Sequence, residues 1–216
     1  MLHIRIACSK KDLVGMLGKD VSAIINDYKI LNACTDVSYP QVEGLKNKSI
    51  QSEINQLLKQ QALALIPKEG CDVYQTIKGI YKITLNQKGI LSVKFDVYTF
   101  RWHAANGLNV QKSVTVNLET GNVYQVYNLF KPNSGYRIML TKLIQKQIKE
   151  RNLPLIKDFK VIPDNQDFYL TNNALVIYFQ EIEYTPHYIG IPEFPIPFRQ
   201  IESLINEQGP IIRFVK

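Results

Sequence analysis

The chain has 216 residues, of which 45% are hydrophobic and 21% are charged, so it can bury a core and its composition excludes a disordered chain. Lys and Arg number 26 against 19 Asp and Glu, and the net charge of +7 favours anionic partners without selecting nucleic acid, an envelope polymer or an acidic protein. No run of residues approaches the ~18 apolar positions of a membrane-spanning helix.

The first 30 residues show no single period and predict only a strand and a short helix. They also lack the hydrophobic run of a signal peptide, because Lys10, Lys11 and Asp12 interrupt it. As written, the sequence predicts a cytoplasmic protein, or an exported one if a leader or anchor has been removed.

The next part of the chain predicts a strand over 29–39 and then a helix over 47–65. Asn47 is a favourable N-cap, apolar residues recur at helical spacing, and Pro67 and Gly70 end the helix. Three strands with alternating apolar residues follow, at 74–85, 90–102 and 109–118.

The strand at 90–102 changes its apolar face near residue 98. Leu91, Val93, Phe95 and Val97 share one face, whereas the other face carries Tyr98, Phe100 and Trp102. A bulge near residue 98 would bury both sets, and this is the expected arrangement. The alternative is that the three aromatic residues face a partner.

The second half predicts a helix over 136–150, a hairpin and a proline-rich loop. The helix has one apolar side and, on another side, Lys142, Lys146 and Lys149. The hairpin pairs 168–170 with 174–179 around Asn172-Asn173, since Asn tolerates positive φ. The elements together predict an α+β fold in which an antiparallel sheet carries two main helices, with two subdomains in one compact unit.

The loop after the hairpin is rich in proline and large apolar residues, which need a surface to lie on. We expect it to be ordered and partly strand, with Phe194 and Ile196 against the sheet. A last short helix is expected over 198–205.

The three cysteines, Cys8, Cys34 and Cys71, include no CxxC pair and cannot form a disulfide framework. One bridge with a free thiol is possible, but three reduced thiols in a reducing compartment is the simpler interpretation.

Residues that carry catalysis or bind metal are hard to find in this sequence. His3, His103 and His187 form no HxH or HxxxH pattern, which predicts no metal site. No phosphate-binding loop or GxSxG motif occurs. Glu181 and Glu183 have the i,i+2 spacing of many surface strands. We therefore predict a protein that is not an enzyme and that has no catalytic residues and no cofactor.

The candidate binding residues lie on the aromatic strand, the small-residue turn after it and the proline-rich loop. They are Tyr98, Phe100, Trp102, His103, Asn106, His187 and Tyr188.

Several stretches, in a specific order and spacing over about residues 30–200, resemble one bacterial envelope-associated family. Tyr39-Pro40-Gln41-Val42 and the residues 44–48 resemble the start of the non-catalytic N-terminal domain of the PdaC peptidoglycan deacetylases. The stretches that resemble the RsiV-type C-terminal domain are 103–107 (HAANG), 115–121 (TVNLETG), 128–132 (NLFKP), 167–170 (DFYL), 176–179 (VIYF) and 190–197 (GIPEFPIP).

The resemblance implies an N-terminal segment at 1–30, a PdaC-type module at 31–104 and an RsiV-type module at 105–216. The best-understood member is an anti-sigma factor whose extracellular part binds lysozyme. The sequence shows neither a sigma-binding segment nor a deacetylase domain, so neither activity is expected to carry over. Asn106 stands where many relatives have a second histidine.

These observations predict a non-catalytic recognition or sensing module that binds a protein or a cell-wall glycan, in an oligomeric state that the sequence leaves open. One alternative is a hydrolase of cell-wall material that uses His103 with a carboxylate such as Asp96. Another is an anion or nucleic-acid binder that uses the lysine side of the helix 136–150. Nucleic acid is the less expected partner, because that helix lacks interleaved aromatic residues.

Overall fold

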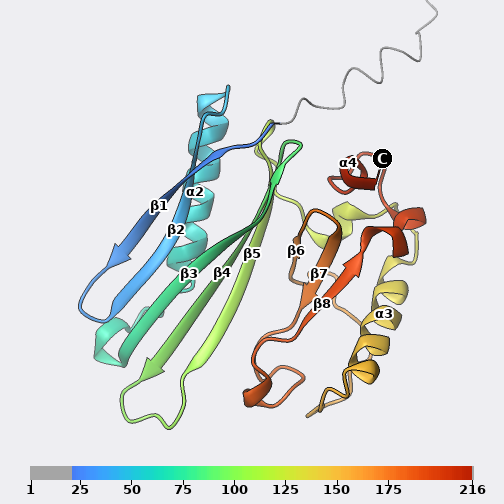
Figure 1. Cartoon of the computed structure of the whole chain (residues 1–216). Helices are drawn as coiled ribbons and strands as arrows, with labels where there is room; N and C mark the ends of the chain where they lie inside the picture. Colours follow the sequence, from blue (N-terminus) through green and yellow to red (C-terminus); the bar gives the residue numbers. More distant parts are fainter. Residues whose placement is uncertain (1–20, 216) are drawn as a thin grey trace, which may run out of the picture.

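A computed structural model describes residues 21–215 of the chain. Within this range, eight strands form two sheets, one with the order β1-β2-β3-β4-β5 and one with the order β6-β7-β8. Figure 1 shows the two sheets next to each other, with helix α2 on the first and helix α3 beside the second. The predicted α+β class is confirmed.

The five-stranded sheet contains one parallel contact in an otherwise antiparallel arrangement. Its strands are β1 (Ile24–Leu31), β2 (Thr35–Glu43), β3 (Tyr74–Gln87), β4 (Ile90–Arg101) and β5 (Leu108–Asn117). The parallel contact joins Thr35–Val37 to Ile77–Gly79. It arises because α2 (Lys48–Ala64) and the 3-10 turn η1 (Gly70–Asp72) form the crossover that parallel neighbours require.

The strand predicted over 29–39 is wrong, because a turn divides it into parts of β1 and β2. The Asn32 side-chain oxygen accepts hydrogen bonds from the backbone N–H groups of Cys34 (3.1 Å) and Thr35 (2.8 Å). An asparagine side chain that bonds the backbone ahead of it stabilises a tight turn. The strand and helix expected before residue 21 lie outside the described residues.

The helix predicted over 47–65 is confirmed as α2. The Asn47 side chain accepts hydrogen bonds from the N–H groups of Ser49 (2.9 Å) and Ile50 (3.2 Å), which otherwise have no partner within the helix. Ile54, Leu58 and Ala62 are buried in the core between α2 and the sheet.

The bulge expected near residue 98 is wrong. β4 pairs with β5 in one continuous register from Ile90–Asn117 to Thr99–Leu108. The irregularities lie on the β3 side, at Tyr74/Thr76 and Ile83/Leu85. Tyr98 therefore stays on the opposite face from the core, where its ring lies over Gly107. A Cβ on Gly107 would come within 2.2 Å of that ring, so glycine is required for this contact.

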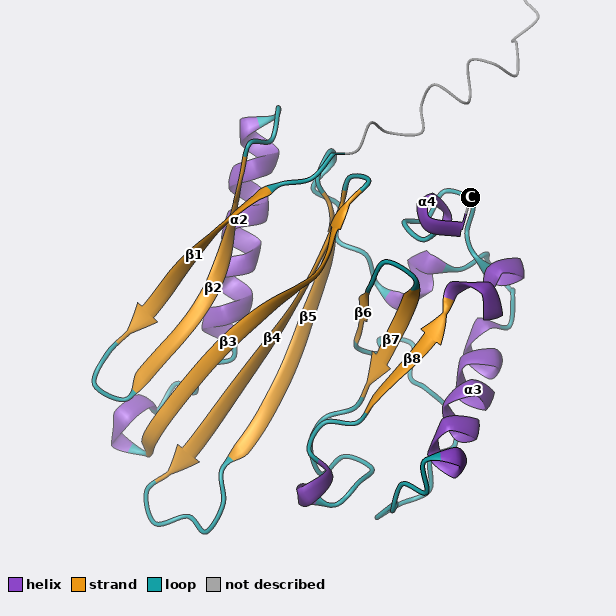
Figure 2. Cartoon of the chain, in the orientation of Figure 1, coloured by secondary structure: helices purple, strands orange, loops and turns teal. Residues whose placement is uncertain are grey.

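The three-stranded sheet has the predicted hairpin and adds the proline-rich segment as its third strand (Figure 2). Phe194 and Ile196 are 1% and 0% exposed, as expected. The elements of this half are η2 (Val126–Leu129), α3 (Tyr136–Glu150), β6 (Phe168–Leu170), β7 (Ala174–Tyr178), η3 (His187–Ile189) and β8 (Glu193–Pro197). The helix expected over 198–205 is instead two 3-10 turns, η4 (Phe198–Gln200) and η5 (Glu202–Leu204), before a final α4 (Ile212–Val215).

Two hydrophobic cores meet at the hairpin of β3 and β4. Leu91 and Phe95 belong to the core under α2, whereas Leu85 and Ile90 belong to the core of the second half. The division expected between residues 104 and 105 lies in the turn between β4 and β5, two strands that pair with each other. The change from one sheet to the other comes after β5.

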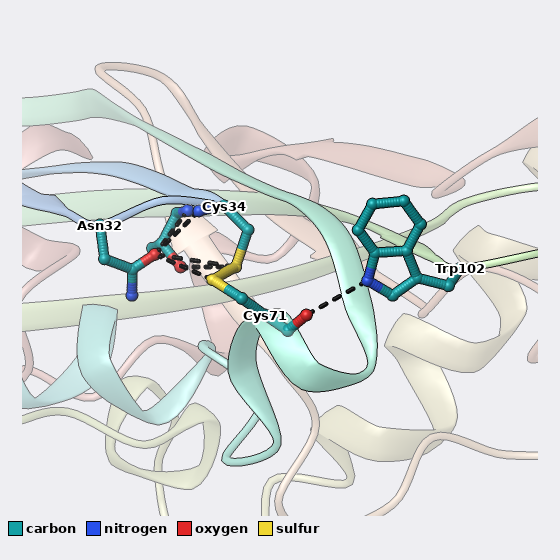
Figure 3. The surroundings of a disulfide bond; sticks show 5 residues. Asn32, Cys34, Cys71 and Trp102 are labelled. Carbon is teal, nitrogen blue, oxygen red and sulfur yellow. Dashed lines mark hydrogen bonds between the residues drawn. A yellow bond between two sulfur atoms is a disulfide. The ribbon is translucent and has the colours of Figure 1, made fainter.

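A disulfide joins Cys34 to Cys71, with their Cα atoms 5.5 Å apart (Figure 3). The expectation of three reduced thiols is therefore wrong. The bond ties the turn after β1 to η1, two segments that are 37 residues apart in sequence. Sequence spacing could not show this proximity, because the parallel contact of β2 and β3 creates it. Cys8 lies outside the described residues.

We expect Phe194→Ala to lower the free energy of unfolding by about 3–5 kcal/mol, because it leaves a cavity in a closed core. The Phe194 ring packs edge-on against Phe179, with 5.7 Å between ring centroids, and under the Arg151 guanidinium. Chemical denaturation checks the value. Tyr188→Ala is the control, because Tyr188 is 76% exposed, and equal losses in the two variants would contradict the packing role.

We expect replacement of both Cys34 and Cys71 by serine to cost about 2–4 kcal/mol, because the bridge restricts the unfolded chain over a long loop. Denaturation of the double variant beside the oxidised wild type measures the difference. The same replacement measured against wild type under reducing conditions is the control and should give nearly no difference. A full difference under reducing conditions would show that the serines, and not the lost bridge, cause the effect.

Candidate functional site

Two segments that are about 80 residues apart in sequence meet at one end of the molecule. They are the turn after β4, residues 102–107, and the loop after β7, residues 180–190; both lie at the lower end of Figure 1. The Nε2 atom of His187 lies 2.9 Å from the carbonyl oxygen of Gly107, which accepts the hydrogen bond. We call these two segments together the paired loops.

Glu181 fastens the paired loops to the start of β5. Its Oε2 atom accepts hydrogen bonds from the backbone N–H of Asn109 (2.5 Å) and from the Asn109 side chain (3.3 Å). Its Oε1 atom lies 3.4 Å from His187 Nε2, and the side chain is only 2% exposed. Spacing suggested a surface carboxylate, but β7 ends at Tyr178 and the chain then turns Glu181 inward.

Both paired loops contain backbone conformations that L-residues rarely adopt. His103 has φ of 60° and Ile182 has φ of 64°. For a β-branched residue such as Ile182 this conformation is a genuine outlier, because Cβ crowds the neighbouring carbonyl. Ile182 is nevertheless 47% exposed, so burial of its side chain does not account for the strain. Strain that the surrounding bonds maintain is typical of functional loops.

Trp102 is fixed by hydrogen bonds of its indole N–H and backbone N–H, and about half of its side chain is exposed to solvent. Its indole N–H donates to the carbonyl oxygen of Cys71 at 3.2 Å (Figure 3). Its backbone N–H donates to the carbonyl oxygen of Val73 at 3.1 Å. The side chain remains 49% exposed. The disulfide therefore anchors the segment against which Trp102 rests.

The other candidate residues differ in exposure. Tyr188 is 76% and Tyr98 is 37% exposed, and Phe100 is partly buried. His103 and Asn106 are exposed in the turn. The structure thus brings the turn and His187 together, whereas sequence reasoning named both but had no means of pairing them.

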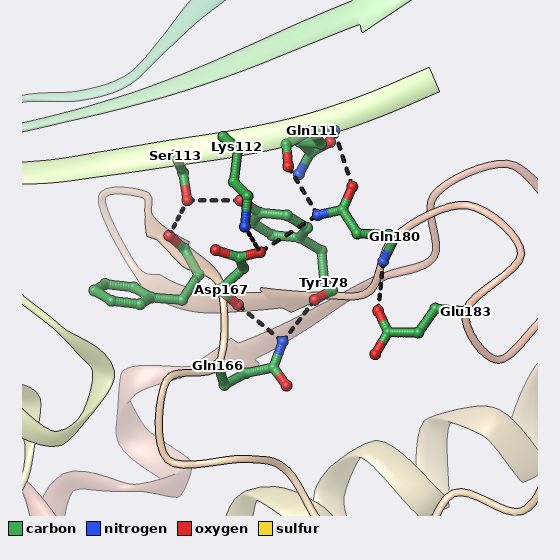
Figure 4. A network of polar contacts seen from close by, with 9 residues as sticks. Gln111, Lys112, Ser113, Gln166, Asp167, Tyr178, Gln180 and Glu183 are labelled. Atoms are coloured by element: carbon green, nitrogen blue, oxygen red, sulfur yellow. Dashed lines mark hydrogen bonds and ion pairs between the residues drawn. The ribbon is translucent and has the colours of Figure 1, made fainter. Parts of the chain in front are cut away.

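A seam of side chains next to the paired loops joins β5 to the second half (Figure 4). The Gln180 amide accepts from the Gln111 N–H at 3.1 Å and donates to the Gln111 carbonyl at 2.8 Å, as a neighbouring strand would. Lys112 pairs with Asp167 at 2.7 Å. The Ser113 hydroxyl lies 2.9 Å from the Tyr178 hydroxyl and donates to the carbonyl of Phe168.

Burial changes the pKa of hydroxyl and carboxyl groups at and near this seam. Burial raises the pKa of the Tyr178 hydroxyl, and the Asp167 carboxylate adds to the rise, so the phenol stays protonated. Burial also raises the pKa of Asp96, and the Lys94 ammonium at 3.4 Å opposes that rise. Lys94 further bonds Glu193 at 2.9 Å.

The hydrolase arrangement of His103 with Asp96 is not formed. Six residues of largely extended chain lie between them, which corresponds to roughly 20 Å, and Asp96 pairs with Lys94 instead. Within residues 21–215 no group of three His, Cys, Asp or Glu side chains could hold a metal ion. No helix in the same range is long and apolar enough to cross a membrane.

The two-sheet fold has solved relatives in a family described as a protein of unknown function, DUF3298. A member from Bacteroides fragilis NCTC 9343 matches with a TM-score of 0.67 and 13% identity over 92% of this chain and 99% of that chain. A member from Pseudomonas aeruginosa PAO1 matches with a TM-score of 0.54 and 12% identity over 85% and 93%. At these identities the likeness shows the fold.

Comparisons of the sequence with known proteins give two further matches. Residues 127–199 match the model of the DUF3298 family. The chain is also 25% identical over 217 aligned residues to the anti-sigma-V factor RsiV of Bacillus subtilis (strain 168), across 92% of this chain and 75% of that protein. Both findings support an RsiV-like C-terminal domain.

We expect Gln180→Ala to cost about 1–3 kcal/mol, because it leaves the N–H and carbonyl of Gln111 without their partner. Hydrogen exchange should then quicken at Gln111. The control is Gln200→Ala, which changes an exposed residue outside the seam. Unchanged exchange at Gln111 in the Gln180 variant would show that the amide does not act as a substitute strand.

Proposed function

We propose that this chain is a non-catalytic sensing module that binds a protein through the surface of the paired loops. The observation that carries the proposal is the fastening of two strained loops to each other and to β5, through His187–Gly107 and Glu181–Asn109. A surface of this kind is ordered before a partner arrives, so binding does not have to bear the entropy of ordering it.

The exposed side chains of this end suit a protein partner. Large apolar residues here are open to solvent at 37–76%: Tyr98, Trp102, Leu108, Ile182 and Tyr188. Tyrosine and tryptophan are enriched among the residues that dominate binding energy in protein interfaces. Neither charge nor a metal cluster defines the surface.

The kind of partner is inferred from the similarity to the anti-sigma-V factor RsiV. An anti-sigma factor is a regulatory protein that acts through protein contacts, and 25% identity over most of both chains supports a regulatory or sensing role here. Lysozyme is the ligand that the resemblance implies. A net charge of +7 slows the approach of a basic protein, so short-range contacts of the paired loops would have to carry the affinity.

The Cys34–Cys71 bridge supports placing this module in an oxidising compartment, outside the cytoplasm. The cytoplasmic expectation rested on the lack of a signal-peptide run near the N-terminus, and the bridge favours the alternative of an exported protein. We further propose that residues 31–104 form a PdaC-type module. The supporting observation is that the stretch that carries the resemblance begins within β2 and leads directly into the capped helix α2.

We expect Trp102→Ala and Tyr188→Ala each to weaken binding of lysozyme by about tenfold or more, which is ~1.4 kcal/mol. Calorimetric titration of the purified oxidised chain measures the affinity. Tyr127→Ala is the matched control, since Tyr127 is 54% exposed on η2 and lies outside the paired loops.

Two outcomes would overturn the proposed protein-binding surface, and one would change only the partner. Lysozyme binding that tolerates both substitutions would move the site away from the paired loops. Absence of lysozyme binding, with a captured protein partner lost in the same variants, would retain the surface and change the partner. Binding of peptidoglycan fragments in place of any protein would favour the glycan alternative.

A further inference from the structure

Strand edges expose unpaired N–H and C=O groups, and this protein covers several of its edges with side chains or with backbone groups of neighbouring segments. On β5, Gln180 pairs with Gln111, Glu181 accepts from Asn109, and the Thr115 carbonyl accepts from the N–H of Tyr124 at 2.8 Å. Natural sheets protect their edges because a bare edge is a template for pairing with another chain.

Both edges of the three-stranded sheet are covered as well. On β6, the Leu170 N–H donates to the Ser92 hydroxyl at 3.0 Å, and the Phe168 carbonyl accepts from Ser113. On β8, Pro195 and Pro197 have no N–H to expose. The β8 carbonyls accept from α3: Pro195 from Gln147 at 2.9 Å and Glu193 from Arg151 at 2.8 Å.

The outer edge of β1 is different. The Asn32 N–H donates to the Thr35 carbonyl, and the register runs from there without a shift to Ile24–Glu43. Because antiparallel pairs alternate, the even residues of β1 bond to β2 and the odd residues turn their backbone groups outward. The outward residues are Ile25, Asp27, Lys29 and Leu31.

The same alternation is confirmed on the other side of β2. Val42 lies opposite Ile25, so its backbone groups must point away from β1, and they bond to the Asn55 side chain at 2.6 and 3.0 Å. For the four outward residues of β1, residues 21–215 provide no backbone partner. Figure 1 shows β1 at the free side of its sheet.

Apart from the charges of Asp27 and Lys29, β1 lacks the usual protections of an edge strand. It is 8 residues long and contains no proline and no bulge. Its large apolar side chains are exposed: Ile24 at 61%, Tyr28 at 44% and Leu31 at 66%. A long, regular and apolar edge favours the addition of another strand.

We propose that a second copy of this chain pairs with β1, antiparallel and edge to edge, with the two-fold axis at Tyr28. The two five-stranded sheets then form one continuous sheet. In this register Asp27 lies opposite Lys29 of the partner subunit, and Ile25 lies opposite Leu31 of the partner subunit. Each is a pair of outward residues, so all four exchange backbone hydrogen bonds.

Charge selects this register among its neighbours. A shift by two residues places Asp27 opposite itself or Lys29 opposite itself, and like charges directly opposite are destabilising. A shift by one residue places outward backbone groups opposite inward ones. The register centred on Tyr28 alone pairs opposite charges twice and leaves Tyr28 beside its own copy.

The two charged side chains each have a partner within the chain, but both stay exposed to solvent, so pairing with a second copy would compete with these contacts. Lys29 bonds Asp36 at 3.3 Å, but both side chains are about half exposed, so the pair is weakly held. Asp27 is exposed and lies near the hydroxyl of Tyr81. The inference concerns a surface distinct from the paired loops and goes beyond the proposed function.

Sedimentation equilibrium of the full chain should give roughly twice the chain mass of 24.8 kDa at high protein concentration. Asp27→Lys or Lys29→Asp should each weaken the dimer by tenfold or more, and the double exchange should restore it. Asp36→Asn, which removes only the contact within one chain, and Lys146→Asp on α3 should leave the mass unchanged. A wild-type monomer at every concentration, or a double exchange that stays dissociated, overturns the proposal.

Cross-linking tests the register itself. Tyr28→Cys with Cys8→Ser places two thiols at the axis, where a pair that does not share hydrogen bonds has Cα atoms about 4.5 Å apart, within disulfide range. Mild oxidation should give a covalent dimer. Asn26→Cys in the same background keeps both charge pairs and should not cross-link, because its two copies are offset by four residues along the strands, roughly 13 Å. Equal cross-linking at both positions, or at neither, overturns the register.

Discussion

The structure depends on one constraint: backbone hydrogen-bonding groups that leave a regular ladder must find another partner. Three side-chain amides supply it by imitating a peptide group, each accepting from the N–H and donating to the carbonyl of a single residue. Asn55 does this for Val42, Asn86 for Ala23 at 2.9 and 2.8 Å, and Gln180 for Gln111. Each stands where a strand has ended or diverged, so the ladder continues without another strand.

The side chains that cover the strand edges also connect the two halves of the molecule. The residues that cover β5 come from the loop after β7, and the residues that cover β6 come from β4 and β5. Neither sheet is therefore complete without the other. Leu85 and Ile90 lie on strands of the first sheet but belong to the core of the second half, and they add an apolar contribution at the same junction. A displacement of the loop at 180–190 would expose backbone groups of β5, which ties the shape of the paired loops to the stability of the whole.

Elements with a strong period were predictable, because their local sequence alone decides them. The helix at 136–150 and the strands of the β4–β5 hairpin match within about a residue or two. The division of 29–39 depended on one asparagine side chain, and the Cys34–Cys71 bridge depended on a parallel contact between distant strands. Candidate residues such as Trp102 and His187 could be named from composition, but Glu181 could not, since only the path of the loop buries it.

The contact of Trp102 with Cys71 gives the protein an internal optical reporter. Trp102 is the single tryptophan of the chain, and its indole is bonded to the residue that carries one sulfur of the bridge. Because a disulfide close to an indole quenches its emission, we expect reduction of the bridge to brighten the fluorescence of this one tryptophan. The emission intensity then depends on whether the bridge is oxidised or reduced. The emission wavelength depends on whether the exposed ring is in water or against another surface. The intrinsic fluorescence of Trp102 can therefore report separately on the state of the disulfide and on contact of the exposed ring with a partner.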